Sequence, residues 1–256
     1  MKVLRDRVAV ITGAGGGLGR ALAAELASRG CHLALLDVNE EALAGTASAV
    51  RRHAVNVTQH VADVTDRAQM AALPAAVLEA HGRVNLLINN AGITLQKVFG
   101  THSLADWERV IGINLWGVIY GCHFFLDALR RADEAHIVNV SSMSAFLGLP
   151  QQSSYCATKA AIKGLSESLW PELAMEGIGV TSVHPGAIKT EMMQATLDES
   201  DDVDAARRNY ELVQKMGIAP ERAAARIVRE PISGQAAVAR PWKRLECSVS
   251  MGTFWS

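Results

Sequence analysis

The chain has 256 residues, a formal net charge of −1 at pH 7, and hydrophobic side chains at 49% of its positions. This length fits one domain of ordinary size, and the apolar fraction is enough to bury a core without disulfides or a structural metal. The near-neutral charge excludes a general electrostatic attraction to nucleic acid or to an acidic membrane surface.

Cysteine usage and the N-terminal segment indicate a cytoplasmic protein. Cys31, Cys122, Cys156 and Cys247 are widely spaced and form neither a CxxC pair nor a Cys/His ligand pattern. We therefore expect reduced thiols and no metal site. The first residues run directly into an apolar strand and lack a cleavable signal pattern. No apolar run reaches the length expected of a membrane span.

The N-terminal part of the chain has the pattern of a dinucleotide-binding βαβ unit. A short apolar run at 7–12 is typical of a buried parallel strand. A glycine-rich turn at 13–19 follows, then a helical segment at 20–29 and a second strand at 32–36 that ends in Asp37. Glycines let the backbone approach a pyrophosphate, and the helix N-terminus contributes amides and a dipole that hold it.

An ordinary tight turn would explain the glycines by themselves, but the flanking strands and the acid favour a nucleotide site. A Walker phosphate loop is excluded, because the cluster lacks the Gly-Lys-Ser/Thr ending. Asp37 stands where an acid accepts hydrogen bonds from the adenosine ribose hydroxyls, and it would repel a 2′-phosphate. Val38 and Asn39 provide no cation to attract such a phosphate, so the pattern favours NAD over NADP.

Strands and helices continue to alternate through the middle of the chain. We expect these segments at 40–52 (helix), 55–61 (strand), up to His81 (helix) and 84–88 (strand). Asp63, followed by Val64, comes directly after the third strand. A carboxylate there contacts an adenine amino group, or it caps the helix that begins near Thr65 and Asp66. Spacing alone leaves both interpretations open.

Two polar features accompany the fourth strand and the helix after it. The segment 89–92 (NNAG) places small residues after the strand, which suits either a backbone lying against a ligand or an ordinary turn. The helix predicted at 106–129 carries Asn114 among apolar neighbours. A buried amide needs hydrogen-bond partners, so Asn114 is either a structural tie or part of a site.

The strongest candidates for chemistry follow a fifth strand at 135–140. Ser142 comes first, Tyr155 comes thirteen residues later, and Lys159 is at i+4 from Tyr155, on the same face of a helix. An ammonium beside a phenol lowers the pKa of the phenol from its usual value of about 10. We therefore expect Tyr155 to act as a general acid/base on an alcohol or carbonyl. A Tyr and a Lys at this spacing also occur on surface helices by chance.

The last third of the chain is less regular. We expect a helix at 155–176, a strand at 179–183, a charged helical stretch at 191–217 and a helix at 219–228. The tail at 232–256 contains only weak strand candidates, at 236–239 and 245–251, and Pro241 interrupts it.

The alternation predicts an α/β fold, a single-domain Rossmann-type doubly wound parallel β-sheet with helices on both faces. We assign one domain to 1–256, with a substrate lid at about 191–217 and an atypical C-terminal tail at 232–256. The candidate residues follow the C-terminal ends of predicted strands, which is where such folds bind ligands.

These motifs, in this order, resemble the short-chain dehydrogenase/reductase (SDR) family in its compact single-domain subgroup. The resemblance rests on 12–19 (TGAGGGLG), 89–92 (NNAG), Asn114, the Ser142/Tyr155/Lys159 set and 185–190 (PGAIKT), and it covers roughly residues 4–195. It implies an NAD(P)-dependent oxidoreductase that moves a hydride between nicotinamide and a secondary alcohol or ketone. The alternatives are a catalytically silent NAD(H)-binding sensor or scaffold, and an epimerase or dehydratase of the same fold.

The resemblance also implies roles for single residues. Tyr155 would be the acid/base, Ser142 would polarise the substrate oxygen, and Asn114 would hold a water in a proton relay. Lys159 would lower the pKa of Tyr155 and bind the nicotinamide ribose, while Thr190 and the backbone at 188 would grip the carboxamide. The implied cofactor contacts are Gly13, Gly15, Gly17, Leu18, Gly19, Asp37, Val38, Asp63, Val64, Asn90, Ala91, Gly92, Tyr155, Lys159, Pro185, Gly186, Ile188 and Thr190.

Partners follow from the same resemblance. It implies a small-molecule alcohol or ketone substrate and a homo-oligomer, either a tetramer or a dimer, with no nucleic acid or membrane partner. A largely apolar pocket, suited to a hydrophobic ketone or secondary alcohol, is suggested by Ser144, Ala145, Phe146, Leu147, Leu149 and Gln152. Several of these side chains could instead be packed in the core.

Overall fold

The protein is built on a six-stranded parallel sheet, in agreement with the predicted α/β fold. The computed structural model describes residues 3–229, and the strand order is β3-β2-β1-β4-β5-β6. The strands are β1 (Val8–Thr12), β2 (His32–Asp37), β3 (Val57–Val61), β4 (Leu86–Asn89), β5 (Ala135–Val140) and β6 (Ile178–Val183). The seventh-strand candidates at 236–239 and 245–251 lie outside the described residues.

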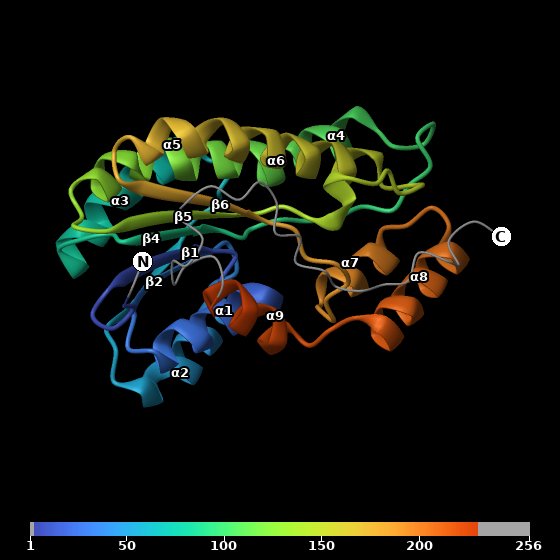
Figure 1. Ribbon diagram of the computed structural model, residues 1–256. Helices are drawn as coiled ribbons and strands as arrows, with labels where there is room; N and C mark the ends of the chain where they lie inside the picture. The colour runs from blue at the N-terminus through green and yellow to red at the C-terminus, as the bar shows by residue number, and fades with distance from the viewer. Residues whose placement is uncertain (1–2, 230–256) are drawn as a thin grey trace.

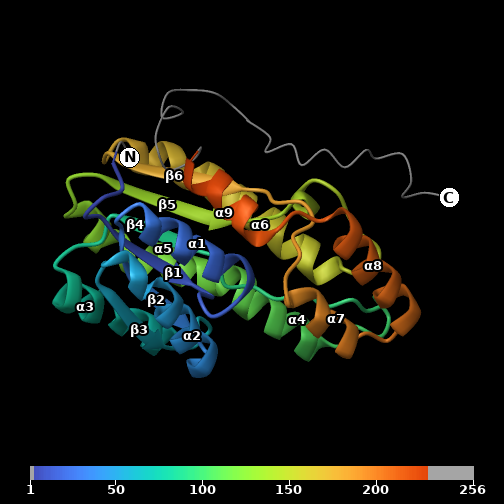
Figure 2. The same ribbon diagram turned by 90° about the horizontal axis from the view of Figure 1, so that it is seen from below.

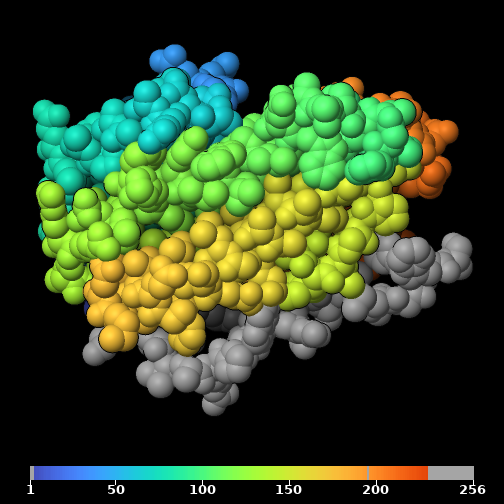
Figure 3. Space-filling model, turned by 90° about the horizontal axis from the view of Figure 1, so that it is seen from above, coloured from blue at the N-terminus to red at the C-terminus, as the bar shows by residue number. Residues whose placement is uncertain are grey.

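Helices cover both faces of this sheet (Figure 1). One face carries α1 (Gly17–Ser28), α2 (Glu40–Val50) and α9 (Pro220–Ile227), which Figure 2 shows from below. The other face carries α3 (Arg67–His81), α4 (Leu104–Ile111), α5 (Gly117–Arg130) and α6 (Ser153–Ala174). The continuous helix α4–α5 and α6 run side by side there (Figure 3). Because both faces are covered, the central strands β1 and β4 are buried along their whole length, whereas the edge strand β3 carries polar, partly exposed residues.

The sheet has a switch point between β1 and β4, and this is what places the site. β1 pairs with β2 on one side, in the register Thr12↔Leu36, and with β4 on the other. The connections after β1 and β4 therefore leave the sheet in opposite directions, which opens a crevice at the carboxyl ends of the strands. The helices α7 (Met192–Asp198) and α8 (Val203–Met216) lie beyond this end of the sheet (Figure 1).

Helix boundaries differ from the sequence predictions at several ends. Helix α1 begins at Gly17 with Gly16 as its N-cap, three residues before the predicted start at position 20, so the last glycines of the turn belong to the helix. The stretch predicted as one helical segment at 191–217 is two helices, because Asp202 caps α8 by accepting a hydrogen bond from the Ala205 amide.

The helix predicted at 106–129 extends from Leu104 to Arg130 and contains a π-helical turn, η2 (Gly112–Trp116). A capping box between Ser103 and Asp106 begins it two residues earlier than predicted. Contrary to the sequence expectation, this helix is long and apolar enough, by length and composition, to cross a membrane, with a mean hydropathy of 1.3. Its composition has a local cause, since Val118, Cys122 and Phe125 on its inner face pack in the core against the sheet.

Strand β5 carries a histidine, His136, within the sheet. His136 on β5 pairs with Gly179 on β6, and its ring occupies the space that a side chain would fill, since a Cβ at Gly179 would lie 2.3 Å from the ring. The Nε2 atom of the ring is 2.8 Å from the Thr181 hydroxyl. Burial lowers the pKa of His136 from 6.5 to about 4.

Acid should therefore destabilise the protein before its carboxylates titrate. Between pH 6.5 and pH 4, His136 is protonated in the unfolded chain but stays neutral in the folded chain. The free energy of unfolding therefore decreases as the pH falls through this range, by about 2–3 kcal/mol at pH 4.5. In urea titrations at pH 7 and pH 4.5, His136→Gln should lose that much less stability between the two values than the wild type. An equal loss in both proteins would contradict this account.

Candidate active site

A cavity of about 1030 Å³ opens at the carboxyl ends of the strands, and it collects most of the predicted site residues. One end is formed by the glycine turn, the middle by the segments that follow β4 and β5, and the other end by α7 and α8. The predicted residues that line it are Gly13, Gly17, Leu18, Asp37, Asn90, Ala91, Gly92, Ser142, Tyr155, Lys159, Pro185, Gly186, Ile188 and Thr190.

The remaining predicted residues do not line the cavity. They are Gly15, Gly19, Val38, Asp63, Val64 and Asn114. Asp63 accepts a hydrogen bond from the Thr65 amide, while Asp66 caps α3 by accepting from the amides of Ala68 and Gln69. The helix-cap interpretation of Asp63 is therefore wrong, because Asp66 occupies that role.

The glycine turn is packed so closely that several of its positions admit no side chain. Gly13 and Gly17 have φ values of +64° and +50°, in the left-handed region that disfavours other residues. A Cβ at Gly19 would lie 1.9 Å from the Gly13 carbonyl oxygen. A Cβ at Gly16 would approach only a carboxylate oxygen of Glu191, at 3.3 Å. The turn thus presents bare backbone to the cavity directly before the N-terminus of α1, which fits a pyrophosphate group.

Asp37 and the end of β4 hold this turn in place. One carboxylate oxygen of Asp37 accepts a hydrogen bond from the Gly15 amide at 2.7 Å, and the other accepts from the Asn39 amide at 3.0 Å. The side-chain amide of Asn90 donates to the carbonyls of Thr12 and Gly13, each at 3.0 Å. Asn90 therefore ties β4 to the glycine turn, and the backbone of the NNAG segment lies against the cavity.

Two hydrogen bonds bring Ser142, Tyr155 and Lys159 together. The buried ammonium of Lys159 donates to the Val140 carbonyl at 2.9 Å, and the Ser141 hydroxyl donates to the Lys159 carbonyl at 2.7 Å. These bonds lock α6 onto the end of β5. The ammonium lies 5.6 Å from the centroid of the Tyr155 ring, on the same helix face, as the i, i+4 spacing predicts.

The electrostatics of this set differ from the sequence prediction. Lys159 was expected to lower the pKa of Tyr155, but burial raises the pKa of that phenol, and the hydrogen bond with Ser142 opposes the rise only in part. Burial likewise lowers the pKa of Lys159 to about 8. The reason is geometric: the ammonium is bonded to the Val140 carbonyl and stands beside the ring rather than at the phenolic oxygen.

Asn114 is a structural tie in this structure. Its side-chain oxygen accepts from the Ile93 amide at 2.8 Å, and its nitrogen donates to the Ile93 carbonyl at 2.9 Å and to the Thr158 hydroxyl at 3.2 Å. The residue is fully buried in the π-helical turn, a feature common at functional sites. A Cβ at Gly92 would lie 3.2 Å from Asn114 Oδ1 and 3.4 Å from Lys159 Nζ, so a side chain there would require both groups to shift.

The segment predicted as a lid closes the far end of the cavity. An isolated parallel bridge between Ile188 and Ile218 joins the two ends of this segment. Polar contacts then attach it to the rest of the protein: Glu199 forms an ion pair with Arg109, and the Ser200 hydroxyl donates to the Gln96 carbonyl at 2.9 Å.

Sequence reasoning missed most of the residues that line this end. Ser144, Leu147, Leu149 and Gln152 line the cavity as expected, whereas Ala145 and Phe146 do not. The unexpected lining residues include Thr94, Gln96, Arg109, Ile113, Met192, Met193, Asn209, Leu212, Val213 and Met216. The sequence did indicate the last four of these, Asn209, Leu212, Val213 and Met216. They follow the i, i+3, i+4, i+7 spacing of one helix face on α8, which is otherwise charged.

Comparisons with known proteins agree with this geometry. The family described as short chain dehydrogenase matches residues 7–201. The chain is 37% identical over 227 residues to levodione reductase from Leifsonia aquatica, which covers 86% of this chain and 85% of that protein.

Solved structures extend the comparison. A short-chain dehydrogenase/reductase from Burkholderia phymatum in complex with NAD has a TM-score of 0.81 and 33% identity, covering 90% of this chain and 88% of that one. An NAD+-bound xylitol dehydrogenase has a TM-score of 0.82 and 26% identity, covering 92% of this chain and 95% of that one.

The glycine turn offers a direct test. Gly19→Ala should displace the turn, because its Cβ would overlap the Gly13 carbonyl, and it should weaken NADH binding at least tenfold in a fluorescence titration. Gly45→Ala is the matched control, since a Cβ there meets nothing within 4 Å. In the middle of α2 it should raise stability by about 0.5–1 kcal/mol and leave NADH binding unchanged. Unchanged NADH binding by Gly19→Ala would refute the assigned role of the turn.

Proposed function

Because this chain belongs to the short-chain dehydrogenase family of oxidoreductases, we propose that it transfers a hydride between a nicotinamide cofactor and a secondary alcohol or ketone. One observation carries the proposal. Ser142, Tyr155 and Lys159 line a single cavity with the glycine turn, so a carbonyl carbon beside Tyr155 is within reach of a nicotinamide whose pyrophosphate lies on the turn.

Proton transfer is assigned to Tyr155. When bound, the nicotinamide supplies or accepts the hydride. In the reducing direction the Tyr155 hydroxyl gives its proton to the carbonyl oxygen, while the Ser142 hydroxyl donates a hydrogen bond to the same oxygen and polarises it. The raised pKa of Tyr155 keeps its proton in place at neutral pH until the carbonyl oxygen takes it.

Lys159 and the 185–190 turn are assigned to holding the cofactor. The Lys159 ammonium uses one of its three protons on the Val140 carbonyl, and because Lys159 lines the cavity, ribose hydroxyls bound there would accept the other two. Thr190 lies against the glycine turn, since a Cβ at Gly17 would be 3.1 Å from its methyl group. Thr190 and the backbone at Ile188 are thus placed to orient the carboxamide. Asn114 supports Lys159 through Gly92 rather than by a contact of its own.

We further propose NAD as the preferred cofactor. Asp37 is a cavity-lining carboxylate at the end of β2, with one oxygen bonded to the glycine turn and the other to the Asn39 amide, and ribose hydroxyls would donate to the remaining lone pairs. The same charge repels a 2′-phosphate. Val38 beside it is exposed and carries no charge, so nothing at these two positions compensates for that repulsion.

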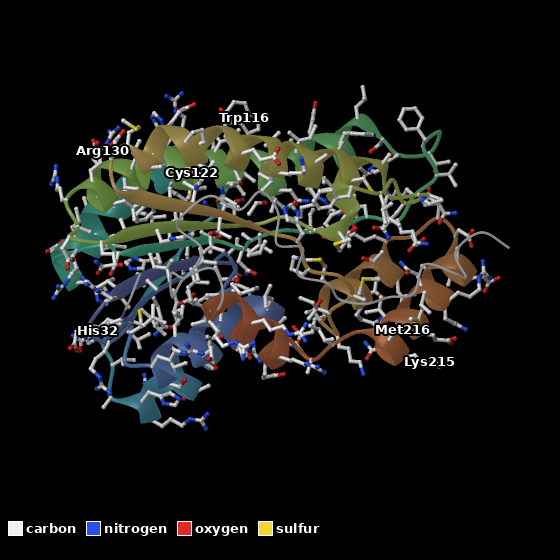
Figure 4. All side chains as sticks on the ribbon, viewed as in Figure 1. His32, Trp116, Cys122, Arg130, Lys215 and Met216 are labelled. Carbon is white, nitrogen blue, oxygen red and sulfur yellow. The ribbon has the colours of Figure 1, made fainter. Side chains whose placement is uncertain are left out.

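A cytoplasmic homo-oligomer of single-domain subunits completes the proposal. Cys31 and Cys122 are free and buried, as befits a reducing compartment, and burial raises the pKa of each thiol to about 12. An aromatic row along η2 and α5 offers a surface for a second subunit. It consists of exposed Trp116 and half-buried Tyr120 and Phe124, with centroids 5.5 and 5.8 Å apart. Trp116 points away from the sheet (Figure 4).

Replacing Tyr155 separates catalysis from binding. Tyr155→Phe removes the proton donor and keeps the ring, so turnover of a ketone substrate should fall at least ~100-fold while NADH affinity stays nearly the same. Steady-state kinetics and a fluorescence titration measure the two quantities. Full activity in this variant would sink the assignment, and NADH binding without turnover of any carbonyl by the wild type would favour a silent binding protein.

Cofactor preference is tested at β2. The double variant Asp37→Ser with Val38→Arg removes the repelling carboxylate and adds a cation, so the ratio of kcat/KM for NADP over NAD should rise more than about tenfold, or roughly 1.4 kcal/mol. A ratio that does not move would place the ribose contact at another residue.

A further inference from the structure

The cavity contains a polar group that the proposed reaction does not use. Gln152 stands at the N-cap of α6, is 8% exposed and lines the cavity. Its side-chain amide neither caps the helix nor forms a hydrogen bond with any other residue in the part of the chain that the structure describes. A buried amide without partners is uncommon, because burial removes the hydrogen bonds that water would make.

Neighbouring polar groups show what distinguishes Gln152. The hydroxyls of Thr94 and Ser144 also lack partners among residues 3–229, but both oxygens are sealed from solvent. The Gln152 amide is not among these sealed groups, so the little surface that it keeps faces the cavity. Gln152 is also three residues before Tyr155, at the start of the same helix, and both residues line the cavity. The free amide and the proton donor therefore face the same space.

The surrounding charges exclude one class of substrate. Within the described lining, the cations are Arg109 and Lys159. Arg109 is paired with Glu199, and Lys159 belongs to the catalytic set. The acids Glu191 and Glu199 add negative charge, so a carboxylate or phosphate on the substrate would find repulsion and no free partner.

The substrate end also has an apolar wall. Ile113, Leu147, Leu149, Met192, Leu212 and Val213 line it. Two other amides line this end, but Gln96 accepts a hydrogen bond from Asn209 and donates one to Gln151. Beside the apolar wall, the Gln152 amide is thus the one of the three whose donors and acceptor are all unused within the described residues. An amide offers both donors and an acceptor, so it binds a hydroxyl or a carbonyl oxygen equally well.

We propose that the substrate is an uncharged, largely apolar ketone or secondary alcohol with a second oxygen one or two carbons from the reacting carbon, and that Gln152 binds this second oxygen. The inference rests on the proposed function and narrows its substrate class to hydroxyketones, diketones and the corresponding diols. A substrate without the second oxygen would bury the amide unpaired, and an enzyme discriminates strongly against such a loss.

The experiment compares matched ketones in the wild type and in Gln152→Leu. The probes are 1-phenylpropane-1,2-dione, the monoketone 1-phenylpropan-2-one and the anion phenylglyoxylate, each with NADH. A dione is intrinsically more reactive, so the informative quantity is the change between proteins in the ratio of kcat/KM for dione over monoketone. We expect Gln152→Leu to lower that ratio by roughly tenfold or more, chiefly through KM for the dione.

Controls keep the outcome interpretable. Gln59→Leu makes the same change on exposed β3 and should leave the ratio as in the wild type. Gln152→Met tests the same contact if the leucine variant is unstable, and thermal melting with NADH titration reports folding in each protein. An unchanged ratio in folded Gln152 variants, or efficient reduction of phenylglyoxylate by the wild type, would overturn the inference alone. Wild type that binds NADH and reduces neither ketone would overturn the proposed function, and this inference with it.

Discussion

The hydrogen bond from the Lys159 ammonium to the Val140 carbonyl is the interaction on which the site depends. A buried ammonium is costly unless it is bonded, so this contact holds the side chain in one position. Together with the hydrogen bond from the Ser141 hydroxyl to the Lys159 carbonyl, it joins the end of β5 to the N-terminal part of α6. Tyr155 and Ser142 acquire their relative positions from the same junction, which is why residues thirteen apart in the chain reach one cavity.

Much of the architecture was predictable, because it is encoded in local patterns. Continuous apolar runs identify strands covered on both faces, and the glycine turn followed by a helix and Asp37 identifies the nucleotide end of the crevice. What failed is instructive. Asp63 was considered as a cap of the helix that begins near Thr65 and Asp66, but the carboxylate that accepts from the first helical amides is that of Asp66. The start of α1 was predicted three residues too late. Glycine has a low helix propensity, so the sequence does not indicate that Gly17 and Gly19 belong to the helix, which packing stabilises.

The pKa of Tyr155 and the substrate end of the cavity could not be predicted from spacing. Whether a lysine lowers the pKa of a tyrosine depends on where its ammonium points, and here it points to a backbone carbonyl. The cavity wall combines side chains from segments more than a hundred residues apart, such as Gln96 and Asn209, which share a hydrogen bond of 3.2 Å. Such contacts depend on tertiary packing. In the sequence, only the apolar stripe on α8, at Leu212, Val213 and Met216, indicates that this wall exists.

The bridge between Ile188 and Ile218 holds together the two ends of the 191–217 segment, so this segment can be exchanged as a unit. Because its two ends are already paired, a change in its length or composition costs little in loop-closure entropy and leaves the strand ends untouched. The residues assigned to proton transfer lie outside it, whereas many of those that face the substrate body lie within it. Substrate selectivity can thus change during evolution, or be changed by grafting another segment, through residues of this segment alone. The residues assigned to proton transfer stay the same.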